Sequence, residues 1–199
     1  VIVTDRNGDA VRVTANRNGT YTFEQPRGRV TIEVTFVRTG DTGLPFIDVA
    51  ANAWYYDAVA YAYENGLMSG TASNLFSPDA TTTRGMIVTM LYRLEGEPRV
   101  SGTSTFDDVA DSVYYTDAVI WANANGIVTD YDDTTFGPND AITREQMAVI
   151  LYRYAQYKGY DVTGSAGLSG YADADSVSSW AQYAVAWAVD AGLISGVGN

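Results

Sequence analysis

The sequence lacks cysteine and histidine altogether, and it has a single lysine, Lys158. Without cysteine, the chain has no disulfide scaffold and no thiol chemistry. Without histidine, it lacks the usual general base, the commonest metal ligand and every Ser-His or Cys-His nucleophile pair. Catalysis would have to depend on carboxylates, and we expect no catalytic residue, no metal site and no cofactor.

Long apolar runs and positive charge are also scarce. The sequence contains no stretch of about 18 apolar residues, so it predicts no membrane insertion. Its 24 acidic residues outnumber 12 basic ones, which gives a net charge of −12. We therefore expect no general affinity for nucleic acid or anionic membrane, because both need a basic surface, whereas a local arginine pocket is compatible with this charge.

The chain has 199 residues, of which 46% are hydrophobic, and this is enough to bury a sizeable core in one or two domains. It opens on Val1-Ile2-Val3-Thr4, in what resembles the middle of a strand, without an initiator methionine or a signal sequence. We interpret the sequence as a piece of a longer protein.

The first 37 residues alternate apolar and polar side chains, which is the pattern of half-buried β-strands. Asn7-Gly8 and Asn18-Gly19 separate the apolar runs and favour tight hairpins. We expect three or four short antiparallel strands. Residues 18–36 resemble the last hairpin of the immunoglobulin-like repeats of bacterial surface proteins, and residues 38–45 have the composition of a linker, so residues 1–44 are taken as one segment.

From residue 46 the sequence repeats itself at a constant shift of 60 residues, without a gap. The recurring residues include Phe46, Asp48, Asn65, Gly66, Phe76, Pro78, Thr83, Arg84 and Arg93, which return as Phe106, Asp108, Asn125, Gly126, Phe136, Pro138, Thr143, Arg144 and Arg153. A third copy begins at Tyr171, and no Phe-x-Pro loop or Thr-Arg helix follows in it before Asn199. We call residues 45–104 repeat 1, residues 105–165 repeat 2 and residues 166–199 repeat 3.

Each complete repeat is predicted to form a helix, an ordered loop and a second helix. In repeat 1 the first helix runs from about Trp54 to Glu64, and Gly66 supplies the left-handed conformation that ends it. The second helix carries a one-sided apolar stripe, which is typical of a buried core. The fold class is therefore α+β by segment, mainly α-helical, with a small antiparallel β segment in front.

The ordered combination of motifs resembles the S-layer homology domain. Repeat 1 contains FIDV, WYYDAV, ENGL, FSP and TTRGM, repeat 2 contains FDDV, YYTDAV, ANGI, FGP and ITREQM, and repeat 3 contains YADA, WAQYAV and DAGLISG. The resemblance covers residues 46–199, about three-quarters of the chain. Gly85 and Met86 depart from the family pattern, which often has alanine and glutamate at these positions.

The resemblance implies a non-catalytic anchor in which three repeats form a pseudo-threefold helical assembly. Family members hold proteins to the bacterial cell wall by binding secondary cell-wall polysaccharides, often pyruvylated, in grooves between neighbouring repeats. We accordingly expect an extracellular location at the cell wall or cell surface. Two alternatives stay open: self-association in a surface-layer lattice, and the anchor part of a surface hydrolase whose catalytic part lies outside this chain.

An arginine follows a threonine at both expected starts of the second helix. Arg84 and Arg144 then lie at the end of the helix where the dipole is positive, which costs about 0.3–1 kcal/mol. An anion at the same place reverses that cost, because free backbone N–H groups and a guanidinium together form a bidentate carboxylate site. The alternative is a structural ion pair with Asp48 or Asp108.

Other candidate ligand contacts have structural alternatives of similar weight. Thr143 forms a capping box with Gln146, so it is either a helix cap or a ligand contact, while Thr83 has no such partner in the sequence. Three aromatic residues are either platforms for a sugar ring or side chains buried between helices: Trp54, Tyr114 and Trp180. Three acids either accept hydrogen bonds from sugar hydroxyls or cap local turns: Asp48, Asp108 and Asp173. The acidic run at residues 130–133 fails the calcium-loop pattern, because Thr135 and Ala141 replace the required glycine and closing acid, and we interpret it as a solvated loop.

Overall fold

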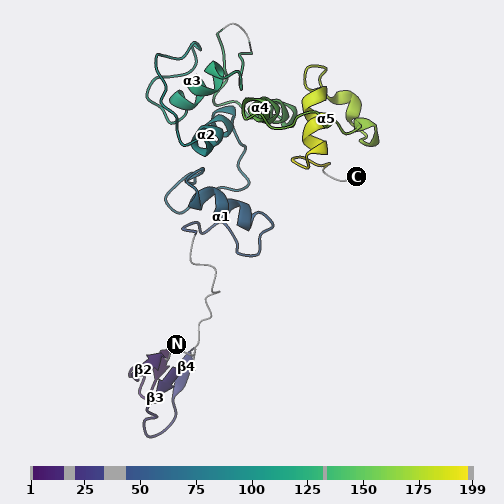
Figure 1. Ribbon diagram of the computed structural model, residues 1–199. Helices are drawn as coiled ribbons and strands as arrows, with labels where there is room; N and C mark the ends of the chain where they lie inside the picture. Colours follow the sequence, from purple (N-terminus) through teal and green to yellow (C-terminus); the bar gives the residue numbers. More distant parts are fainter. Residues whose placement is uncertain (1, 16–20, 34–43, 132–133, 197–199) are drawn as a thin grey trace. The chain divides into compact units, whose positions relative to one another are not determined.

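The computed structural model describes residues 2–15, 21–33, 44–131 and 134–196. The chain divides into two compact units, Val1–Leu44 and Pro45–Asn199. Strands lie in the first unit and helices in the second (Figure 1). The predicted fold class, mainly helical with a small antiparallel β segment, is confirmed, and the pseudo-threefold arrangement stays a prediction.

The described residues of the first unit contain four short strands, as the alternation predicts. Strand β1 (Ile2–Thr4) pairs antiparallel with β4 (Thr31–Glu33), and β2 (Val13–Ala15) pairs antiparallel with β3 (Tyr21–Phe23). The Asn7-Gly8 turn is held by the Asp5 carboxylate, which accepts hydrogen bonds from the N–H groups of Asn7 at 2.8 Å and Asp9 at 3.0 Å. The predicted Asn18-Gly19 turn lies outside the described residues.

The second unit contains the five α-helices of the described chain. They are α1 (Tyr56–Glu64), α2 (Arg84–Leu94), α3 (Thr116–Ala124), α4 (Arg144–Tyr157) and α5 (Gln182–Asp190), with short 3-10 turns η1 (Leu168–Gly170) and η2 (Ala174–Ser176) before α5. The helix–loop–helix order is confirmed for repeats 1 and 2. Helix α1 begins two residues later than predicted, and the φ angle of +69° at Gly66 ends it in the left-handed conformation.

The helices pack across the repeat boundaries. Helix α2 of repeat 1 lies against α3 of repeat 2, and α4 of repeat 2 lies against α5 of repeat 3 (Figure 1). The first pair encloses a core that contains Val88, Val119 and Trp121, and the second pair encloses a core that contains Ala148 and Trp187. Each second helix therefore covers the first helix of the following repeat.

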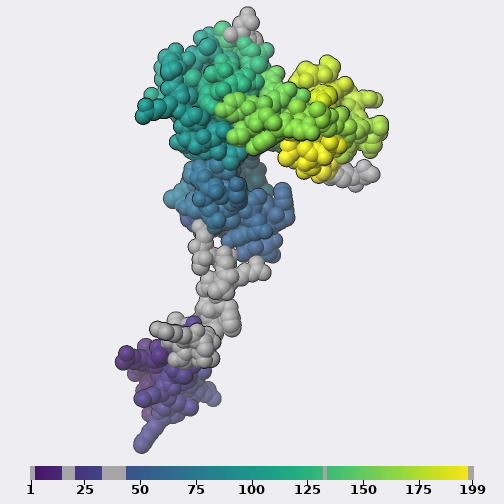
Figure 2. All heavy atoms as spheres, viewed as in Figure 1, coloured from purple at the N-terminus to yellow at the C-terminus, as the bar shows by residue number. Residues whose placement is uncertain are grey.

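Helix α4 takes part in both cores because its two faces carry different residues. Ile150 and Tyr154 face the core of α2 and α3, while Ala148 and Ala155 face α5. In the space-filling view, the green atoms of α4 lie between the teal atoms of repeat 2 and the yellow atoms of repeat 3 (Figure 2). This helix thus fixes the position of repeat 3 relative to the arginine of repeat 1.

A polar cluster joins the end of α2 to α4. The Glu95 carboxylate accepts a short hydrogen bond from the Tyr154 hydroxyl and another from the Lys158 ammonium at 2.9 Å. The Tyr154 and Lys158 bonds lower the pKa of Glu95. The single lysine of the sequence therefore helps to hold the repeat 1 helix to the repeat 2 helix.

Candidate functional site

Both Thr-Arg pairs lie at helix starts, as predicted. The Thr143 hydroxyl accepts a hydrogen bond from the Gln146 N–H at 3.2 Å, and the Gln146 side-chain oxygen accepts one from the Thr143 N–H at 3.1 Å, which confirms the capping box. The expectation that Thr83 has no partner is wrong. Its hydroxyl accepts from the Met86 N–H at 3.3 Å, and the Met86 sulfur takes the place of the missing carboxylate by accepting from the Thr83 N–H at 3.5 Å.

Arg84 extends from the start of α2 into repeat 2. Its Nε donates to the carbonyl oxygen of Phe136 at 2.8 Å, and its Nη2 donates to that of Thr129 at 3.4 Å. The guanidinium carbon also lies 4.3 Å from the ring centroid of Tyr131 and 4.7 Å from that of Phe136. The arginine is thereby enclosed by carbonyl dipoles and aromatic rings of the following repeat.

The charge of Arg84 has no carboxylate partner among the described residues. The residue is only 5% exposed, and in the described part of the chain ion pairs join Arg93 to Glu97 and Lys158 to Glu95, so neither Asp48 nor Asp108 forms the ion pair considered above. Burial lowers the pKa of Arg84, and this lowering is opposed by the charges of nearby tyrosine and aspartate groups. Because an arginine stays protonated, the site holds a desolvated cation that a bound anion would stabilise.

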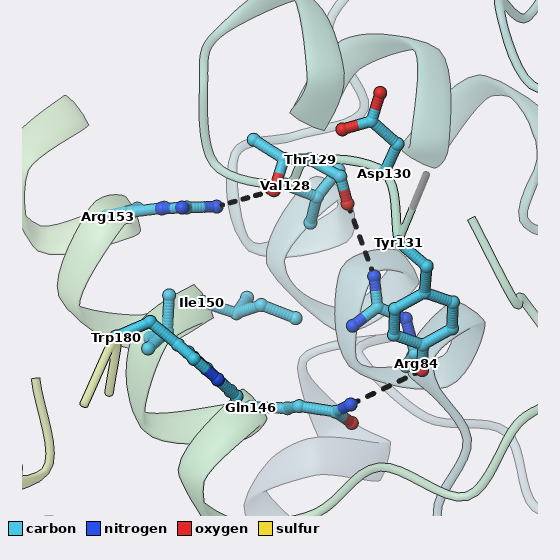
Figure 3. Close-up of a pocket in the computed structure, with 10 residues that line it drawn as sticks. Arg84, Val128, Thr129, Asp130, Tyr131, Gln146, Ile150, Arg153 and Trp180 are labelled. Atoms are coloured by element: carbon cyan, nitrogen blue, oxygen red, sulfur yellow. Dashed lines mark hydrogen bonds between the residues drawn. The ribbon is translucent and has the colours of Figure 1, made fainter. Parts of the chain in front are cut away.

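A groove of 410 Å³ opens beside this arginine, and all three repeats contribute to its lining. Repeat 1 supplies Arg84 and repeat 3 supplies Trp180, while repeat 2 supplies the segment around Thr129 and one face of α4 (Figure 3). Of the predicted ligand contacts, the structure therefore brings Arg84 and Trp180 together in one groove.

The face of α4 in this groove was not among the predicted ligand contacts. Gln146, Ile150 and Arg153 are spaced at i, i+4 and i+7, so they lie on one side of the helix and line the groove (Figure 3). Arg153 Nη1 donates to the Thr129 hydroxyl at 3.2 Å. The sequence signal that pointed to Arg153 was its recurrence, since Arg93 of repeat 1 returns as Arg153 of repeat 2 on the helix that Thr143 caps.

Asp130 and Tyr131, the described residues of the acidic run, also contribute to the groove. The Tyr131 hydroxyl accepts a hydrogen bond from the Gln146 side-chain amide at 3.4 Å, and its ring covers the Arg84 guanidinium (Figure 3). Sequence reasoning interpreted this run as a solvated loop. Tyr131 is exposed at 47%, but it forms one wall of the site.

Arg144 has a different environment from Arg84. It is exposed, and its Nη2 donates a short hydrogen bond to the carbonyl oxygen of Ser195, the repeat 3 counterpart of Thr129. A second groove of 770 Å³ beside it is lined by Thr143 and Arg144 from repeat 2 and by Asp173 and other residues from repeat 3. The two predicted arginines therefore lie in two grooves, and each reaches from its own repeat into the next one.

The aspartates of the first two repeats hold the Phe-x-Pro loops. The Asp108 carboxylate accepts hydrogen bonds from the N–H groups of Phe136 at 2.9 Å and Gly137 at 2.7 Å. Asp48 makes the same pair of bonds in repeat 1, and the bond from the Phe76 N–H is the main cause that lowers the pKa of Asp48. Turn capping, one of the two alternatives considered, is thus present at both residues, whereas Asp173 is exposed in the second groove.

The three aromatic candidates are exposed on the surface. Trp54 is 93% exposed, Tyr114 57% and Trp180 59%, so burial between helices, the alternative considered for them, does not apply. Trp180 lines the first groove, whereas Trp54 and Tyr114 line neither of the two grooves. An exposed ring presents a flat apolar face, as a sugar platform requires.

Two further findings concern the described residues as a whole. None of their histidine, cysteine, aspartate or glutamate side chains gather in a group of three or more that could hold a metal ion. In the same part of the chain, no helix has the length and apolar character needed to cross a membrane.

A family model of the S-layer homology domain matches three segments of the chain, residues 45–85, 105–148 and 170–199. The third match ends where the sequence ends, and it covers the first half of a repeat. The matched segments include most of the residues that line the two grooves, but Val149, Ile150, Arg153 and Leu168 lie outside them.

Similar proteins include enzymes and surface proteins. The chain is 33% identical over 141 residues to an endoglucanase of Bacillus sp. (strain KSM-635) and 30% identical over 158 residues to an amylopullulanase of Thermoanaerobacterium thermosulfurigenes, and these matches cover 71% and 77% of the chain. It is 36% identical over 117 residues, 54% of its length, to the surface-layer 125 kDa protein of Lysinibacillus sphaericus. The chain spans only 15%, 8% and 10% of these three relatives, respectively.

Proposed function

The chain belongs to the S-layer homology domain family, and from that premise we propose that it anchors a bacterial protein to the cell wall by binding an acidic secondary cell-wall polysaccharide. The module acts at the cell surface and performs no catalysis itself. The endoglucanase and the amylopullulanase are named for activities of proteins in which the matching segment is 15% or less of the length.

The buried guanidinium of Arg84, which has no ion-pair partner among the described residues, is the observation that carries this proposal. Desolvation and the position at a helix start each disfavour the charge of Arg84, and a carboxylate on a sugar, such as a pyruvate ketal, would offset both. Nε and Nη2 are engaged by main-chain carbonyls, which fix the plane of the guanidinium against the rings of Tyr131 and Phe136. The cation is therefore held in one orientation before the ligand binds, which reduces the entropy lost on binding.

The remaining groove residues supply a second charge and a platform. Arg153 is oriented by its bond to Thr129 and places a second guanidinium on the opposite side of the groove (Figure 3). Trp180 presents an exposed ring at the groove edge, against which the apolar face of a sugar stacks. Two cations, the carboxylate of Asp130 and one aromatic ring line this groove, and its net positive charge suits an acidic polysaccharide better than a neutral one.

Arg144 and Asp173, in the second groove, provide a further contact with the same polymer. A polymer that repeats its acidic unit occupies both grooves at once, so two weak contacts give firm attachment. The positive charge that Arg84 and Arg153 bring to the first groove also explains how a chain with a net charge of −12 binds an acidic partner.

Co-sedimentation with bacterial sacculi tests the proposal. The chain is expected to sediment with intact sacculi and to stay in solution with sacculi from which the secondary polymer has been stripped. Equal sedimentation with both would contradict polysaccharide binding.

Groove variants make this test specific. We expect Arg153→Ala and Trp180→Ala each to weaken sedimentation by about tenfold, since a well-placed contact in a groove is worth about 1–3 kcal/mol. Arg99→Ala and Tyr160→Ala are matched controls, because Arg99 is an exposed arginine outside both grooves and Tyr160 has the same 59% exposure as Trp180. Equal losses in the controls would show that general charge or surface aromatics cause the binding.

Self-association in a surface lattice is the second candidate function. The similarity to a surface-layer protein favours it. Sedimentation velocity in the absence of glycan distinguishes the two functions, because lattice formation predicts a concentration-dependent increase in mass, whereas polysaccharide anchoring predicts none.

A further inference from the structure

Charge is distributed unevenly between the two units of the chain. Residues 1–44 contain six of the 12 basic residues and five of the 24 acidic ones, whereas residues 45–199 contain six basic and 19 acidic residues. The first unit therefore has a net charge of +1 and the second a net charge of −13. An anionic partner meets much less repulsion at the first unit, whose basic residues are all arginine.

Three of these arginines belong to one small region of the surface. A Cβ added to Gly28 would lie 3.5 Å from Cδ of Arg6, so the aliphatic stem of Arg6 packs against this glycine. The φ angle of +109° at Gly28, which glycine adopts without strain, turns the chain at this point. The Cα atoms of Arg27 and Arg29 are each about 3.8 Å from that of Gly28. We call Arg6, Arg27 and Arg29 the arginine surface.

The strand register also brings these charges together. In the pair of β1 and β4, Thr4 lies opposite Thr31. Two residues further along each chain, the same antiparallel register sets Arg6 opposite Arg29, and residues two apart on a strand share a face. Like charges at opposite positions repel each other, so this arrangement is unfavourable without an anion.

The charges of the arginine surface are not neutralised within the described part of the chain. All three arginines are exposed, and both ion pairs that join described residues lie in the second unit. Asp5, the neighbour of Arg6 in the sequence, uses its Oδ1 to hold the turn by accepting from the N–H groups of Asn7 and Asp9. The three guanidinium groups are therefore accessible to a ligand.

The chemistry of the surface favours a polymer that carries repeated carboxylates. A guanidinium presents a planar fork of N–H donors that matches the two oxygens of a carboxylate. Several such groups on one exposed surface contact several anionic units of a polymer at once, whereas a small anion contacts only part of the surface. Nucleic acid is disfavoured, because its dense phosphate charge is repelled by a chain with a net charge of −12.

We propose that the arginine surface is an additional binding surface for acidic polysaccharide, separate from the grooves of the helical unit. This inference rests on the proposed function, because it assigns to the surface the same polymer that the first groove binds. The groove holds one acidic unit beside Arg84, and the arginine surface contacts other carboxylates of the same polymer. Since both sites belong to one chain, the second contact strengthens attachment without any change in the groove.

Fluorescence anisotropy of the full chain with end-labelled oligogalacturonate, which carries one carboxylate per sugar, tests the proposal. The double variant Arg27→Gln/Arg29→Gln should bind about fivefold more weakly, because two exposed charge contacts are lost. Arg6 is left in place, since its stem packs against Gly28. Methyl-esterified oligogalacturonate keeps the sugar backbone without the charge, and the variant and the original chain should not differ in binding it.

A second double variant, Arg12→Gln/Arg99→Gln, is the matched control. It removes the same charge from two exposed arginines, and Arg12 belongs to the first unit. Val11 N–H donates to the Val3 carbonyl, which places Arg12 at the other end of β1 from Arg6. We expect this control to change oligogalacturonate binding by less than about twofold.

Several outcomes would overturn the proposal. These are no binding of oligogalacturonate by the original chain, equal losses in the two double variants, or tighter binding of a DNA duplex that depends on Arg27 and Arg29. If the chain self-associates in sedimentation velocity and Arg27→Gln/Arg29→Gln abolishes this, a second copy occupies the surface and the assignment to polysaccharide is wrong.

Co-sedimentation with sacculi separates this proposal from the proposed function. If Arg153→Ala weakens sedimentation and Arg27→Gln/Arg29→Gln behaves like its control in both assays, the groove binds the polymer and the arginine surface does not. If the chain sediments equally with intact and stripped sacculi while the oligogalacturonate results are as expected, the proposed anchoring fails and the arginine surface still binds acidic polysaccharide.

Discussion

Replacing each of the two Thr-Arg arginines by glutamine is expected to have very different effects on stability, although the sequence presents them as equivalent. Arg84→Gln removes a charged hydrogen bond at 2.8 Å to the Phe136 carbonyl, worth about 1.5–3 kcal/mol, and two ring contacts worth about 0.5–2 kcal/mol in total. Relief of the unfavourable dipole position returns about 0.3–1 kcal/mol, and the cost of burying the charge is already included in the net value of the hydrogen bond. The free energy of unfolding should fall by about 2–3 kcal/mol.

Arg144→Gln should change the same quantity little. Arg144 is exposed and makes one bond to the Ser195 carbonyl, whose loss costs about 0.5–1 kcal/mol because water replaces it. The dipole relief of about 0.3–1 kcal/mol offsets most of that loss. Its net effect should therefore stay within about 0.5 kcal/mol.

Urea denaturation followed by circular dichroism and tryptophan fluorescence measures both effects. With a urea dependence of about 2 kcal/mol per molar, the Arg84→Gln midpoint should fall by about 1–1.5 M and the Arg144→Gln midpoint by less than about 0.3 M. Arg84→Lys is a useful third variant, since an ammonium keeps the charge but cannot reproduce the planar contact, and most of the loss should persist.

Equal midpoint shifts for the two glutamine variants would refute this reasoning, as would full stability of Arg84→Lys. In sacculus binding, Arg144→Gln should weaken attachment without a matching loss of stability. Unchanged binding together with a large loss of stability would instead make Arg144 a purely structural residue.

Three further substitutions test other contacts. Gly85→Ala should lower the free energy of unfolding by up to about 2 kcal/mol, because the added Cβ would lie 2.8 Å from the Pro138 oxygen. This loss outweighs a gain of about 1 kcal/mol in helix propensity. A variant that is more stable than the original chain in thermal denaturation would show that the approach is not close. The hydrogen bonds from Tyr154 and Lys158 hold the pKa of Glu95 below 4.5, so Glu95 contributes stability above that pH and loses it as the pH falls through the folded-state pKa. Glu95→Gln should therefore flatten the acid side of the stability–pH curve. An unchanged slope would contradict this. Asp108→Asn should cost about 1–3 kcal/mol in urea denaturation, since one amide oxygen cannot replace two carboxylate oxygens that accept from two main-chain N–H groups, and a neutral effect would show that the loop is held by packing alone.

Local features were predicted well because they depend on residues within one helical turn of each other. The Thr143 capping box involves groups three residues apart, and the left-handed glycine that closes α1 is a property of that single residue. The Thr83 cap was missed for an equally local reason, since a methionine sulfur is a weak acceptor that a rule based on glutamate and glutamine does not include.

The candidate site was only partly predicted because its members come from three repeats. Arg84 and Trp180 were named from the sequence, but Arg153 and Tyr131 were not among the predicted contacts. Nothing local separates Arg153 from any other arginine on a helix, and Tyr131 becomes a wall of the groove only because Arg84 lies beneath it.

By itself, the sequence determined the repeated helix–loop–helix unit, the glycine that ends its first helix and the two arginines at helix starts, since all of these follow from spacing and from interactions within a few residues. The tertiary structure decided where those arginines point. Arg84 meets carbonyl groups 45 and 52 residues further along the chain, and it does so because α2 packs on the first helix of the next repeat rather than on its own. The packing of α2 on α3 depends on the complementary shapes of the two surfaces, such as Gly85 against Tyr115. This complementarity exists only once both surfaces are folded.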